Sequence, residues 1–358
     1  MGLHNLEKIF KPRSVAVIGA SRKQGTIGFA LMKNLTDGGY KGQIIPVNPK
    51  YPEIMGIETH KSLSRADQSV DLAIIATPIS TVPKIVKECA EMGIGGAIII
   101  SAGGRETGPE GLELEEKIEK EGRKGGLRII GPNCMGIIGP DWNLNASFAA
   151  HMPPKGNLAF ISQSGAICSA MLDLSLKQNM GFRHFVSIGA MLDVDFGDLI
   201  DYLGTDPKVK SILLYIESLT RFRKFMSAAR AVSRVKPIVI LKSGKGRAGA
   251  EAAASHTGAM AGEDSVYEAA FRRAGVVRVN TLQDFFDCAE LLAKQPLPQG
   301  RRLVIVTNAG GPGVMAADAI EEYGLALSSL SRQTMNRLDD ILPPHWSHGN
   351  PIDILGDA

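Results

Sequence analysis

Cysteine is scarce in this sequence: four cysteines stand among 358 residues, and no two of them form a C-x-x-C pair. No histidine stands at a spacing from them that would complete a zinc site. No apolar run approaches the roughly 18 residues that a membrane-spanning helix needs. The first residues also lack an apolar core followed by a small-residue cleavage site. We therefore expect no protein-bound metal, no secretion, no membrane insertion and a cytoplasmic location.

A strong charge of one sign is also missing. Lys and Arg number 40 and Asp and Glu 37, for a formal net charge of +3. This balance gives no reason to expect sequence-independent binding to nucleic acid or to an anionic membrane. Glycine, by contrast, is abundant: 40 residues, against a usual share of roughly 7%. The surplus predicts many tight turns, and the length predicts two or three domains at roughly 150 residues each.

Short apolar runs rich in β-branched residues alternate with helical stretches in the first part of the chain. Strands are expected at 14–19, 43–48, 71–77, 96–101 and 127–132, and helices at 26–37, 80–92 and 109–124. Strands without polar alternation are typical of parallel sheets that are covered on both faces. The pattern predicts an α/β fold with a doubly wound parallel sheet.

The same alternation of apolar strands and helices begins again after 139–156. This stretch is rich in Pro, Asn and Gly, which predicts an interdomain connection. Further strands are expected at 157–162, 183–189, 210–217, 236–244 and 275–280, with helices at 165–179, 195–204, 221–234 and 263–274. We expect a Rossmann-like domain over 1–140, a flavodoxin-like domain over 150–293 and a third part over 301–358. The third part, with a strand at 302–308 and a helix at 312–323, is too short to bury much core alone. We expect it to be the start of a truncated domain.

The first glycine-rich turn, GASRKQGTIG at 19–28, follows a predicted strand and opens a predicted helix. Gly19, Gly25 and Gly28 allow the backbone to approach an anionic ligand, and the helix N-terminus offers unpaired N–H groups. The spacing does not fit G-x-G-x-x-G, and Asn48–Lys50 replace the expected ribose-binding carboxylate. These features argue against an NAD-dependent dehydrogenase and favour a ligand with more phosphate, such as coenzyme A. The alternative is a plain glycine turn.

Three more loops follow predicted strands of this sheet: Thr77-Pro78, 101–104 and 131–134. Ligands of open α/β sheets bind beyond the carboxyl ends of the strands, so these loops are expected to line one crevice. Within them, Cys134 is either a thiol near the reacting end of the ligand or a small apolar filler.

His256 lies in ASHTGAMAG, after a predicted strand and a basic loop at 242–249. Its small neighbours allow a substrate to approach closely. Imidazole is both a nucleophile and a leaving group at neutral pH, which phosphoryl transfer requires. His256 is therefore a candidate phosphoryl acceptor, and the alternative is a loop histidine without chemistry.

Two strand-to-helix turns are candidates for binding the phosphoryl oxygens. Ser162 and Ser164 precede a helix expected from Gly165, and Gly310-Gly311 open another helix. Ser164 is a good N-cap, and the N-terminus of a helix attracts anions. Each turn alone is also compatible with an ordinary βα connection.

A neutral histidine that attacks phosphorus needs a carboxylate on its second ring nitrogen. Glu217, at the end of the strand predicted over 210–217, is the best placed candidate. Asp193 and Asp195 also follow a strand end, but they fit the role of helix caps equally well.

The chain resembles the nucleoside-diphosphate-forming acyl-CoA synthetases, the superfamily of succinyl-CoA synthetase. The closest resemblance is to the α-type part of ADP-forming acetate–CoA ligase. Six motifs carry it, in the family's order and over nearly the whole chain: GASRKQGTIG, IPVNPK, IIGPNCMGI, ISQSGA, ASHTGAMAG and TNAGGPGVMAADA.

The resemblance implies a CoA-binding domain, a ligase domain with a phosphohistidine at His256, which Glu217 orients, and a second ligase-type domain. The phosphate-binding residues it implies are Ser162, Ser164, Gly165, Gly258, Gly310, Gly311 and Gly313. The CoA-binding residues it implies are Gly19, Ser21, Arg22, Lys50, Ile100, Ser101 and Ala102. The glycine turn and the strand-end loops add Gly25, Pro78, Asn133 and Cys134 as candidates.

The reaction implied by the resemblance converts acyl-CoA, ADP and phosphate into free acid, CoA and ATP, through an acyl phosphate and the phosphohistidine. ADP or ATP with Mg²⁺ would bind to an ATP-grasp part, which this sequence does not contain. We therefore expect an ATP-grasp β subunit or domain as partner, and an oligomer. The alternative function is a CoA-binding regulatory module of a protein acetyltransferase. The sequence does not identify the acyl group.

Overall fold

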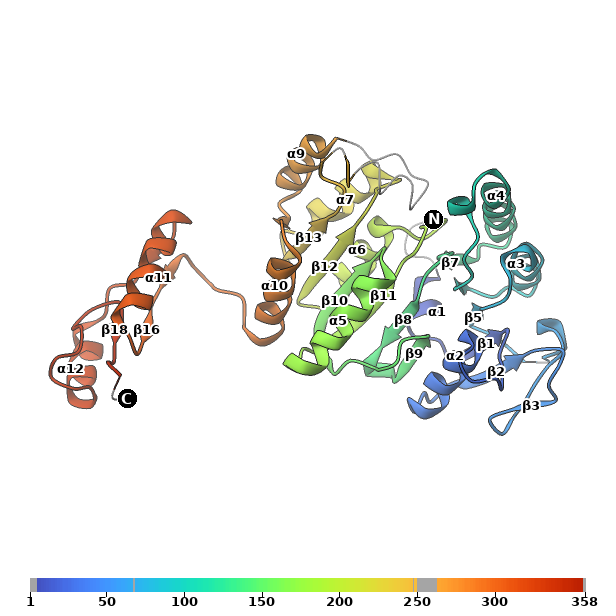
Figure 1. The fold of residues 1–358 in the computed structure, drawn as a ribbon, viewed down its shortest axis with the longest axis horizontal. Helices are drawn as coiled ribbons and strands as arrows, with labels where there is room; N and C mark the ends of the chain where they lie inside the picture. The colour runs from blue at the N-terminus through green and yellow to red at the C-terminus, as the bar shows by residue number, and fades with distance from the viewer. Residues whose placement is uncertain (1–4, 67, 247, 250–262, 357–358) are drawn as a thin grey trace. The chain divides into compact units, whose positions relative to one another are not determined.

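The computed structural model describes residues 5–66, 68–246, 248–249 and 263–356 (Figure 1). The chain divides into two compact units, Met1–Gln295 and Pro296–Ala358. None of the helices in the described ranges is long and apolar enough to cross a lipid bilayer.

The first sheet of the larger unit confirms the doubly wound prediction. Its parallel strands lie in the order β2-β1-β5-β6-β7, with bounds Gln43–Val47, Ser14–Ile18, Leu72–Ile75, Gly96–Ile99 and Arg128–Ile130. Apolar side chains of α1 (Leu6–Phe10) and α2 (Ile27–Asp37) pack on one face. Those of α3 (Val82–Glu91) and α4 (Pro109–Lys124) pack on the other. A small hairpin, β3 (Glu53–Ile54) and β4 (Ile57–Glu58), follows β2.

The second sheet is also mainly parallel, in the order β14-β13-β12-β10-β11-β8-β9. Its parallel strands are β10 (Lys155–Ser162), β11 (Phe182–Ser187), β12 (Ser211–Ile216), β13 (Ile238–Lys242) and β14 (Val277–Val279). On one face lie α5 (Gly165–Gln178) and α10 (Leu282–Lys294), and on the other α6 (Phe196–Thr205), α7 (Phe222–Val232) and α9 (Asp264–Ala274). This is the expected flavodoxin-like arrangement.

The connection expected over 139–156 is replaced in part by strands. β8 (Gly136–Gly139) and β9 (Leu144–Ser147) form an antiparallel hairpin on the edge of the second sheet, and β10 begins at Lys155. Asn143, in the left-handed conformation, makes the turn. The apolar side chains of both strands are buried, because the hairpin covers a sheet edge that would otherwise be open.

In both sheets the strand order reverses at the first of the parallel strands in the chain. β1 lies between β2 and β5, and β10 lies between β11 and β12. At such a reversal the neighbouring helices leave on opposite faces, which opens a crevice at the carboxyl ends of the two strands. Each sheet therefore offers one preferred ligand site.

The two sheets share one hydrophobic core and are also joined through the backbone. Residues 188–194, after β11, run along β7 and the loop that follows it. The N–H of Val194 donates to the Ile129 carbonyl at 3.0 Å, and that of Leu192 donates to the Gly131 carbonyl at 3.1 Å. The N–H of Gly131 donates to the Ile188 carbonyl at 3.2 Å. These contacts place both sheets within one compact unit.

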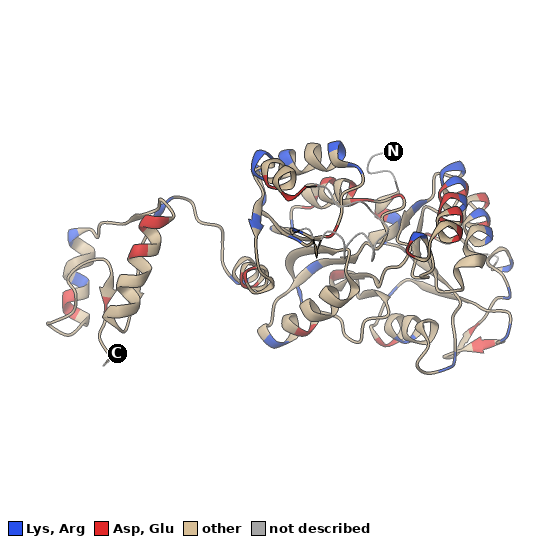
Figure 2. Cartoon of the chain, turned by 45° about the horizontal axis from the view of Figure 1, so that its top comes forward, with Lys and Arg blue, Asp and Glu red and all other residues tan. Residues whose placement is uncertain are grey.

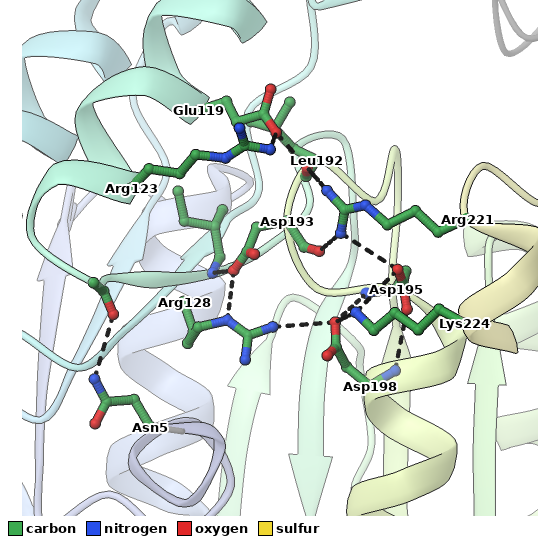
Figure 3. A network of polar contacts seen from close by, with 12 residues as sticks. Asn5, Glu119, Arg123, Arg128, Leu192, Asp193, Asp195, Asp198, Arg221 and Lys224 are labelled. Atoms are coloured by element: carbon green, nitrogen blue, oxygen red, sulfur yellow. Dashed lines mark hydrogen bonds and ion pairs between the residues drawn. The ribbon is translucent and has the colours of Figure 1, made fainter. Parts of the chain in front are cut away.

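Arg128, at the start of β7, adds a buried ionic contact to this joint (Figure 3). Its side chain is 2% exposed. Its Nε lies 2.8 Å from an oxygen of Asp193, and its Nη2 lies 3.1 Å from an oxygen of Asp198, at the start of α6. The same oxygen of Asp193 accepts the N–H of Ile129 at 2.9 Å. One guanidinium therefore links the first sheet to the second.

Two cations of the α7 region complete this cluster (Figure 3). Lys224 lies 2.5 Å from Asp198 and 3.2 Å from Asp195, the N-cap of α6. Arg221 contacts Asp195 at 3.3 Å and donates to the carbonyl oxygens of Leu192 and Asp193. Asp195, left open as a functional candidate, is therefore a helix cap within a balanced ion network.

The smaller unit has two short parallel pairs of strands. β15 (Arg302–Leu303) pairs with β17 (Ala326–Leu327), and β16 (Val306–Thr307) pairs with β18 (Ile352–Asp353). The single strand predicted over 302–308 is therefore split between two partners. The helices are α11 (Gly310–Glu322) and α12 (Arg332–Ile341). Val306 is 65% exposed and Met315 73%, in line with the expectation that this part buries little core.

Substituting Arg128 by Met removes the cation from two largely buried carboxylates. We expect a loss of about 3–5 kcal/mol in the free energy of unfolding, the usual cost of breaking a buried ion pair. Urea unfolding followed by circular dichroism measures it. Arg123→Ala, which removes an exposed partner of Glu119 on α4, is the matched control and should leave the midpoint nearly unchanged. Equal midpoints for the two variants would show that the Arg128 contacts do not hold the sheets together.

Candidate functional site

A cavity of about 500 Å³ lies beyond the carboxyl ends of β1, β2 and β5, at the reversal point of the first sheet. This volume is typical of a small-molecule site. Three of the residues predicted to bind a ligand line it: Gly19, Lys50 and Pro78. The strand ends thus bring together residues that are up to 59 positions apart in the sequence.

The glycine-rich turn is shaped by close backbone contacts. Gly19 has a φ of +94°, and a Cβ atom there would lie 2.6 Å from the Ala76 carbonyl oxygen. A Cβ atom on Gly28 would lie 2.0 Å from the Gly19 carbonyl oxygen, so α2 begins directly against the turn. The Oγ1 of Thr26, the N-cap, accepts the N–H of Phe29 at 3.3 Å. No other residue type fits at Gly19 or Gly28 without moving β1 or α2.

Asn48 connects the end of β2 to this turn. Its Nδ2 donates to the Ala20 carbonyl at 2.7 Å, and its Oδ1 accepts the N–H of Lys50 at 2.9 Å. This side chain occupies the position where a dinucleotide site would have a ribose-binding carboxylate. Asn48 therefore holds the backbone that presents Lys50 to the cavity.

Two lysines that the sequence reasoning missed, Lys61 and Lys84, line the cavity together with Lys50. Within the described residues, none of the three ammonium groups has a hydrogen bond or ion pair. Unpaired lysines around an otherwise largely apolar cavity suit a phosphate-bearing ligand. Their spacing in the chain has no period, so only the fold could have revealed them.

Several predicted CoA-binding residues lie near the cavity without lining it. Arg22 is exposed, donates from Nε to the Glu53 carbonyl at 2.5 Å and lies over the ring of Tyr51. Ser21 is partly buried, and Gly25 is exposed in the same turn. All three residues lie in the turn that connects β1 to α2.

The next two strand ends carry the remaining candidates. Ser101 donates from Oγ to the Thr77 carbonyl at 2.5 Å, which ties its loop to the cavity wall. Ile100 is buried beside it, and Ala102 is exposed. Asn133 is exposed and donates from Nδ2 to Glu106 at 3.2 Å.

Cys134 is part of the protein core. Its Sγ lies 3.3 Å from the Ile99 carbonyl oxygen, and burial raises the pKa of its thiol to about 12. A thiol with such a pKa is almost entirely protonated at neutral pH and is a poor nucleophile. The structure favours the filler interpretation of this residue.

A second candidate site lies at the end of β10, where the other sheet reverses. The Ser162 side chain is fully buried, accepts the N–H of Ser164 at 3.0 Å and donates to the Ser164 carbonyl at 2.9 Å. Ser164 is the N-cap of α5, as predicted, and its Oγ accepts the N–H of Ile167 at 3.4 Å. Gly165, the first helical residue, is exposed. A capped helix start of this kind is a candidate site for an anion.

Glu217 follows β12, the neighbouring strand, and belongs to the same corner. Gln163, which stands between the two serines, accepts the N–H of Glu217 at 2.6 Å and that of Ser218 at 3.0 Å through Oε1. The amide of Gln163 therefore fixes the backbone of Glu217 relative to the α5 start. The sequence reasoning missed Gln163, although its place inside ISQSGA was a usable signal.

A buried cation stands next to this corner. Lys242, opposite Ile216 in the strand register, is 1% exposed, and its ammonium group lies 4.7 Å from the centre of the Tyr267 ring. Burial lowers the pKa of Lys242, and the carboxylates of Asp264 and Glu217 oppose this shift. The corner thus has positive charge available close to Glu217. Among the described residues, no group of His, Cys, Asp and Glu side chains could hold a metal ion.

His256 and Gly258 lie outside the described residues, so their roles stay predictions. In the smaller unit, Gly310, Gly311 and Gly313 form the first turn of α11.

Thr307, at the end of β16, repeats the pattern of Ser162. Its Oγ1 accepts the N–H of Ala309 at 3.2 Å and donates to the Ala309 carbonyl at 2.9 Å. Two helix starts, one in each unit, therefore have the same local construction.

Three domain families match consecutive parts of the chain. They are a CoA binding domain over residues 13–140, a succinyl-CoA ligase like flavodoxin domain over 155–292, and a ligase-CoA domain over 303–358. The matches cover both sheets of the larger unit and most of the smaller unit.

Curated relatives are similar over almost the whole chain. The ADP-forming acetate–CoA ligase of Methanocaldococcus jannaschii is 46% identical over 355 residues, which cover 99% of this chain and 50% of that protein. The α subunit of ADP-forming acetate–CoA ligase II of Pyrococcus furiosus is 44% identical over 354 residues, which cover 99% of this chain and 77% of the subunit. The chain thus spans half the length of the first relative and about three quarters of the second.

Solved structures agree with these relatives. Acetyl-coenzyme A synthetase 1 of Ca. Korarchaeum cryptofilum, in complex with phosphate and ADP, is 37% identical and has a TM-score of 0.93. The match covers 99% of this chain and 76% of that one. A protein of Pyrococcus horikoshii OT3 is 40% identical, with a TM-score of 0.88 and the same coverage. The chain therefore belongs to the nucleoside-diphosphate-forming acyl-CoA synthetase family, which includes the α subunits of ADP-forming acetate–CoA ligases.

Proposed function

We propose that this chain is the part of an ADP-forming acid–CoA ligase that handles acyl-CoA and phosphate. The complete enzyme converts acyl-CoA, ADP and phosphate into free acid, ATP and CoA. The observation that carries the proposal is the corner formed by Ser162, Ser164 and Glu217: a capped helix start whose Gln163 side chain holds the backbone of Glu217. This corner lies at the reversal point of a sheet that is hydrogen-bonded to a second sheet with a cavity of its own.

CoA is proposed to bind at the cavity of the first sheet. The three unpaired lysines and the close backbone approach at Gly19 suit its phosphates, and the apolar strand ends suit its adenine. The proposed contacts are Gly19, Ser21, Arg22, Gly25, Lys50, Pro78, Ile100, Ser101, Ala102 and Asn133, with Cys134 packed behind them.

The proposed chemistry proceeds in two steps on this chain. A phosphate oxygen attacks the thioester carbonyl, CoA leaves as thiolate and takes up a proton, and an acyl phosphate results. A ring nitrogen of His256 then attacks phosphorus, and the free acid leaves as its carboxylate. Glu217 accepts the hydrogen bond of the other ring nitrogen and stabilises the charge that develops on the imidazole.

The helix starts are proposed to hold the phosphoryl oxygens. The helix start at Gly165, which Ser162 and the N-cap Ser164 hold in place, acts with Gly258 at one stage of transfer. The first turn of α11, with Gly310, Gly311 and Gly313, acts at the other. The shared construction of the two turns supports this pairing.

The nucleotide is proposed to bind to an ATP-grasp part, as a β subunit or a further domain, with ADP or ATP and Mg²⁺. The M. jannaschii relative is twice as long as this match, and the P. furiosus relative is named a subunit alpha, which supports such a partner and an oligomer. A cytoplasmic location fits the four cysteines, all of them free. The regulatory alternative receives no support, because the relatives named above are ligases.

Replacing His256 by Ala should abolish acid-labile phosphate on the chain after incubation with acetyl-CoA and radioactive phosphate. His151→Ala, at an exposed histidine in the same unit, is the control and should incorporate phosphate at the normal rate. Gel autoradiography with acid and alkali treatment distinguishes phosphohistidine from phosphoserine. Acid-labile phosphate in His256→Ala would refute the assignment.

The Glu217→Gln variant should reduce the rate of phosphohistidine formation by roughly a hundredfold at neutral pH, within the usual range for acid–base assistance. With Glu217 present, the rate should fall below pH about 6, because only neutral imidazole attacks phosphorus. A carboxylate raises the pKa of a neighbouring histidine, so the acidic limb should move to lower pH in the variant. Rapid-quench measurements across pH test both effects. If the acidic limb of the pH–rate profile is the same in the variant as in the unaltered protein, Glu217 has only a structural role.

Simultaneous Lys50→Ala and Lys61→Ala should weaken CoA binding at least tenfold, an effect of about 1.4 kcal/mol. The variant should also lose most of the preference for CoA over dephospho-CoA. Isothermal titration with both ligands measures this. Lys41→Ala, an exposed lysine that does not line the cavity, is the control. Unchanged CoA affinity in the double variant would place the CoA site elsewhere.

A further inference from the structure

A second groove of about 500 Å³ lies between α7 and α9, and no step of the proposed chemistry uses it. Exposed Arg223 and Arg230 line it from α7, and exposed Arg273 lines it from α9. Partly buried Phe222 and Met226 lie between them. We call this surface the basic groove. It combines an apolar base with guanidinium groups.

The positive charge of the basic groove is not neutralised locally. Residues 221–236 contain six Arg and Lys residues and no Asp or Glu. Arg221 and Lys224 belong to the ion network at the joint, and Lys236 donates to the carbonyls of Leu203 and Asp206. Within the described part of the chain, Arg223, Arg230 and Arg234 have no carboxylate partner.

The carboxylates of α9 are already engaged elsewhere. Arg278, on β14, lies 2.5 Å from Asp264 and 2.8 Å from Glu268. Arg272 and Arg273, in the last turn of α9, have no ion-pair partner among the residues that the structure describes. In Figure 2 the top of the larger unit, where α7 and α9 lie, carries several blue segments. The chain is nearly neutral as a whole, so this surface is a local concentration of charge.

The spacing of the three arginines favours a protein over a small anion as the partner of the basic groove. Arg223 and Arg230 are seven residues apart on one helix, about 10 Å at 1.5 Å per residue, and Arg273 lies on the other helix. A single phosphate or carboxylate contacts one or two guanidinium groups, not three that are so far apart. Arg and Met residues around an apolar groove are typical of protein interfaces.

We propose that the basic groove docks an acidic segment with an apolar anchor, contributed by the ATP-grasp part that completes this enzyme. The proposal rests on the proposed function, which requires such a part. Half of the M. jannaschii relative lies outside the match, and this half is long enough to contain such a segment. Carboxylates of the segment pair with the arginines, and an apolar side chain enters between Phe222 and Met226.

The test uses the complete enzyme, this chain together with its own ATP-grasp part, and follows the two half-reactions separately. In R223E/R230E/R273E, phosphohistidine formation from acetyl-CoA and phosphate should proceed at the normal rate. Transfer of the phosphoryl group to ADP should slow at least tenfold, and its dependence on salt should become flatter because the steering charges are gone. K33E/K41E/K177E makes the same change in net charge at exposed lysines elsewhere and should slow neither half-reaction.

Two further measurements keep the proposal falsifiable. R223Q/R230Q/R273Q removes the charges without reversing them and should give a smaller loss of the same kind, even if the reversal variant folds poorly. Hydrogen–deuterium exchange of α7 and α9 should be slower in the complete enzyme than in the chain alone, and this protection should disappear in either variant. Unchanged exchange and unchanged transfer to ADP would overturn the proposal. If the unaltered enzyme forms no phosphohistidine, the proposed function fails, and exchange protection still decides the role of the groove.

Discussion

The buried guanidinium of Arg128 is the contact on which the arrangement of the larger unit depends. It joins the start of β7 to the Asp193–Asp198 segment, which also runs beside β7 through backbone hydrogen bonds. A buried cation between carboxylates is stable only if its partners stay in place, so this contact opposes a shift of one sheet relative to the other. The cavity of the first sheet and the Ser164–Glu217 corner each lie at the reversal point of a sheet in this unit. Under the proposed function, substrates and intermediates have to move between these two places.

The sequence predicted the fold wherever strands are buried on both faces. Runs such as SVAVI and IVILK are apolar throughout because helices cover both sides of them, and their bounds are within two residues of the prediction. Prediction failed for the edge hairpin β8–β9. β8 pairs with β11, a contact between residues distant in the chain that leaves no local pattern, and β9, at the sheet edge, pairs with β8. The strand expected over 302–308 was split for the same reason, because its halves pair with different neighbours.

The residues of the candidate site also divide into those with a local signature in the sequence and those without one. Gly19, Ser164 and Glu217 were accessible to sequence reasoning, because glycine turns, N-caps and strand ends have local signatures. Lys61, Lys84 and Gln163 were missed, since their roles arise only when strand ends from different parts of the chain meet. Asp195, by contrast, was ambiguous in the sequence and became a helix cap once Arg221 and Lys224 were seen beside it. The residues that the sequence did not reveal are those whose partners are remote in the chain.

The burial of the cysteines has a consequence for side reactions. A protein that handles acyl thioesters risks losing the acyl group to its own thiolates by transthioesterification. Cys89, Cys134 and Cys168 are buried, and burial raises the pKa of each thiol to about 12, so that all three stay protonated at neutral pH. Under the proposed function, these sulfurs fill space in the core without competing for the acyl group of a bound thioester.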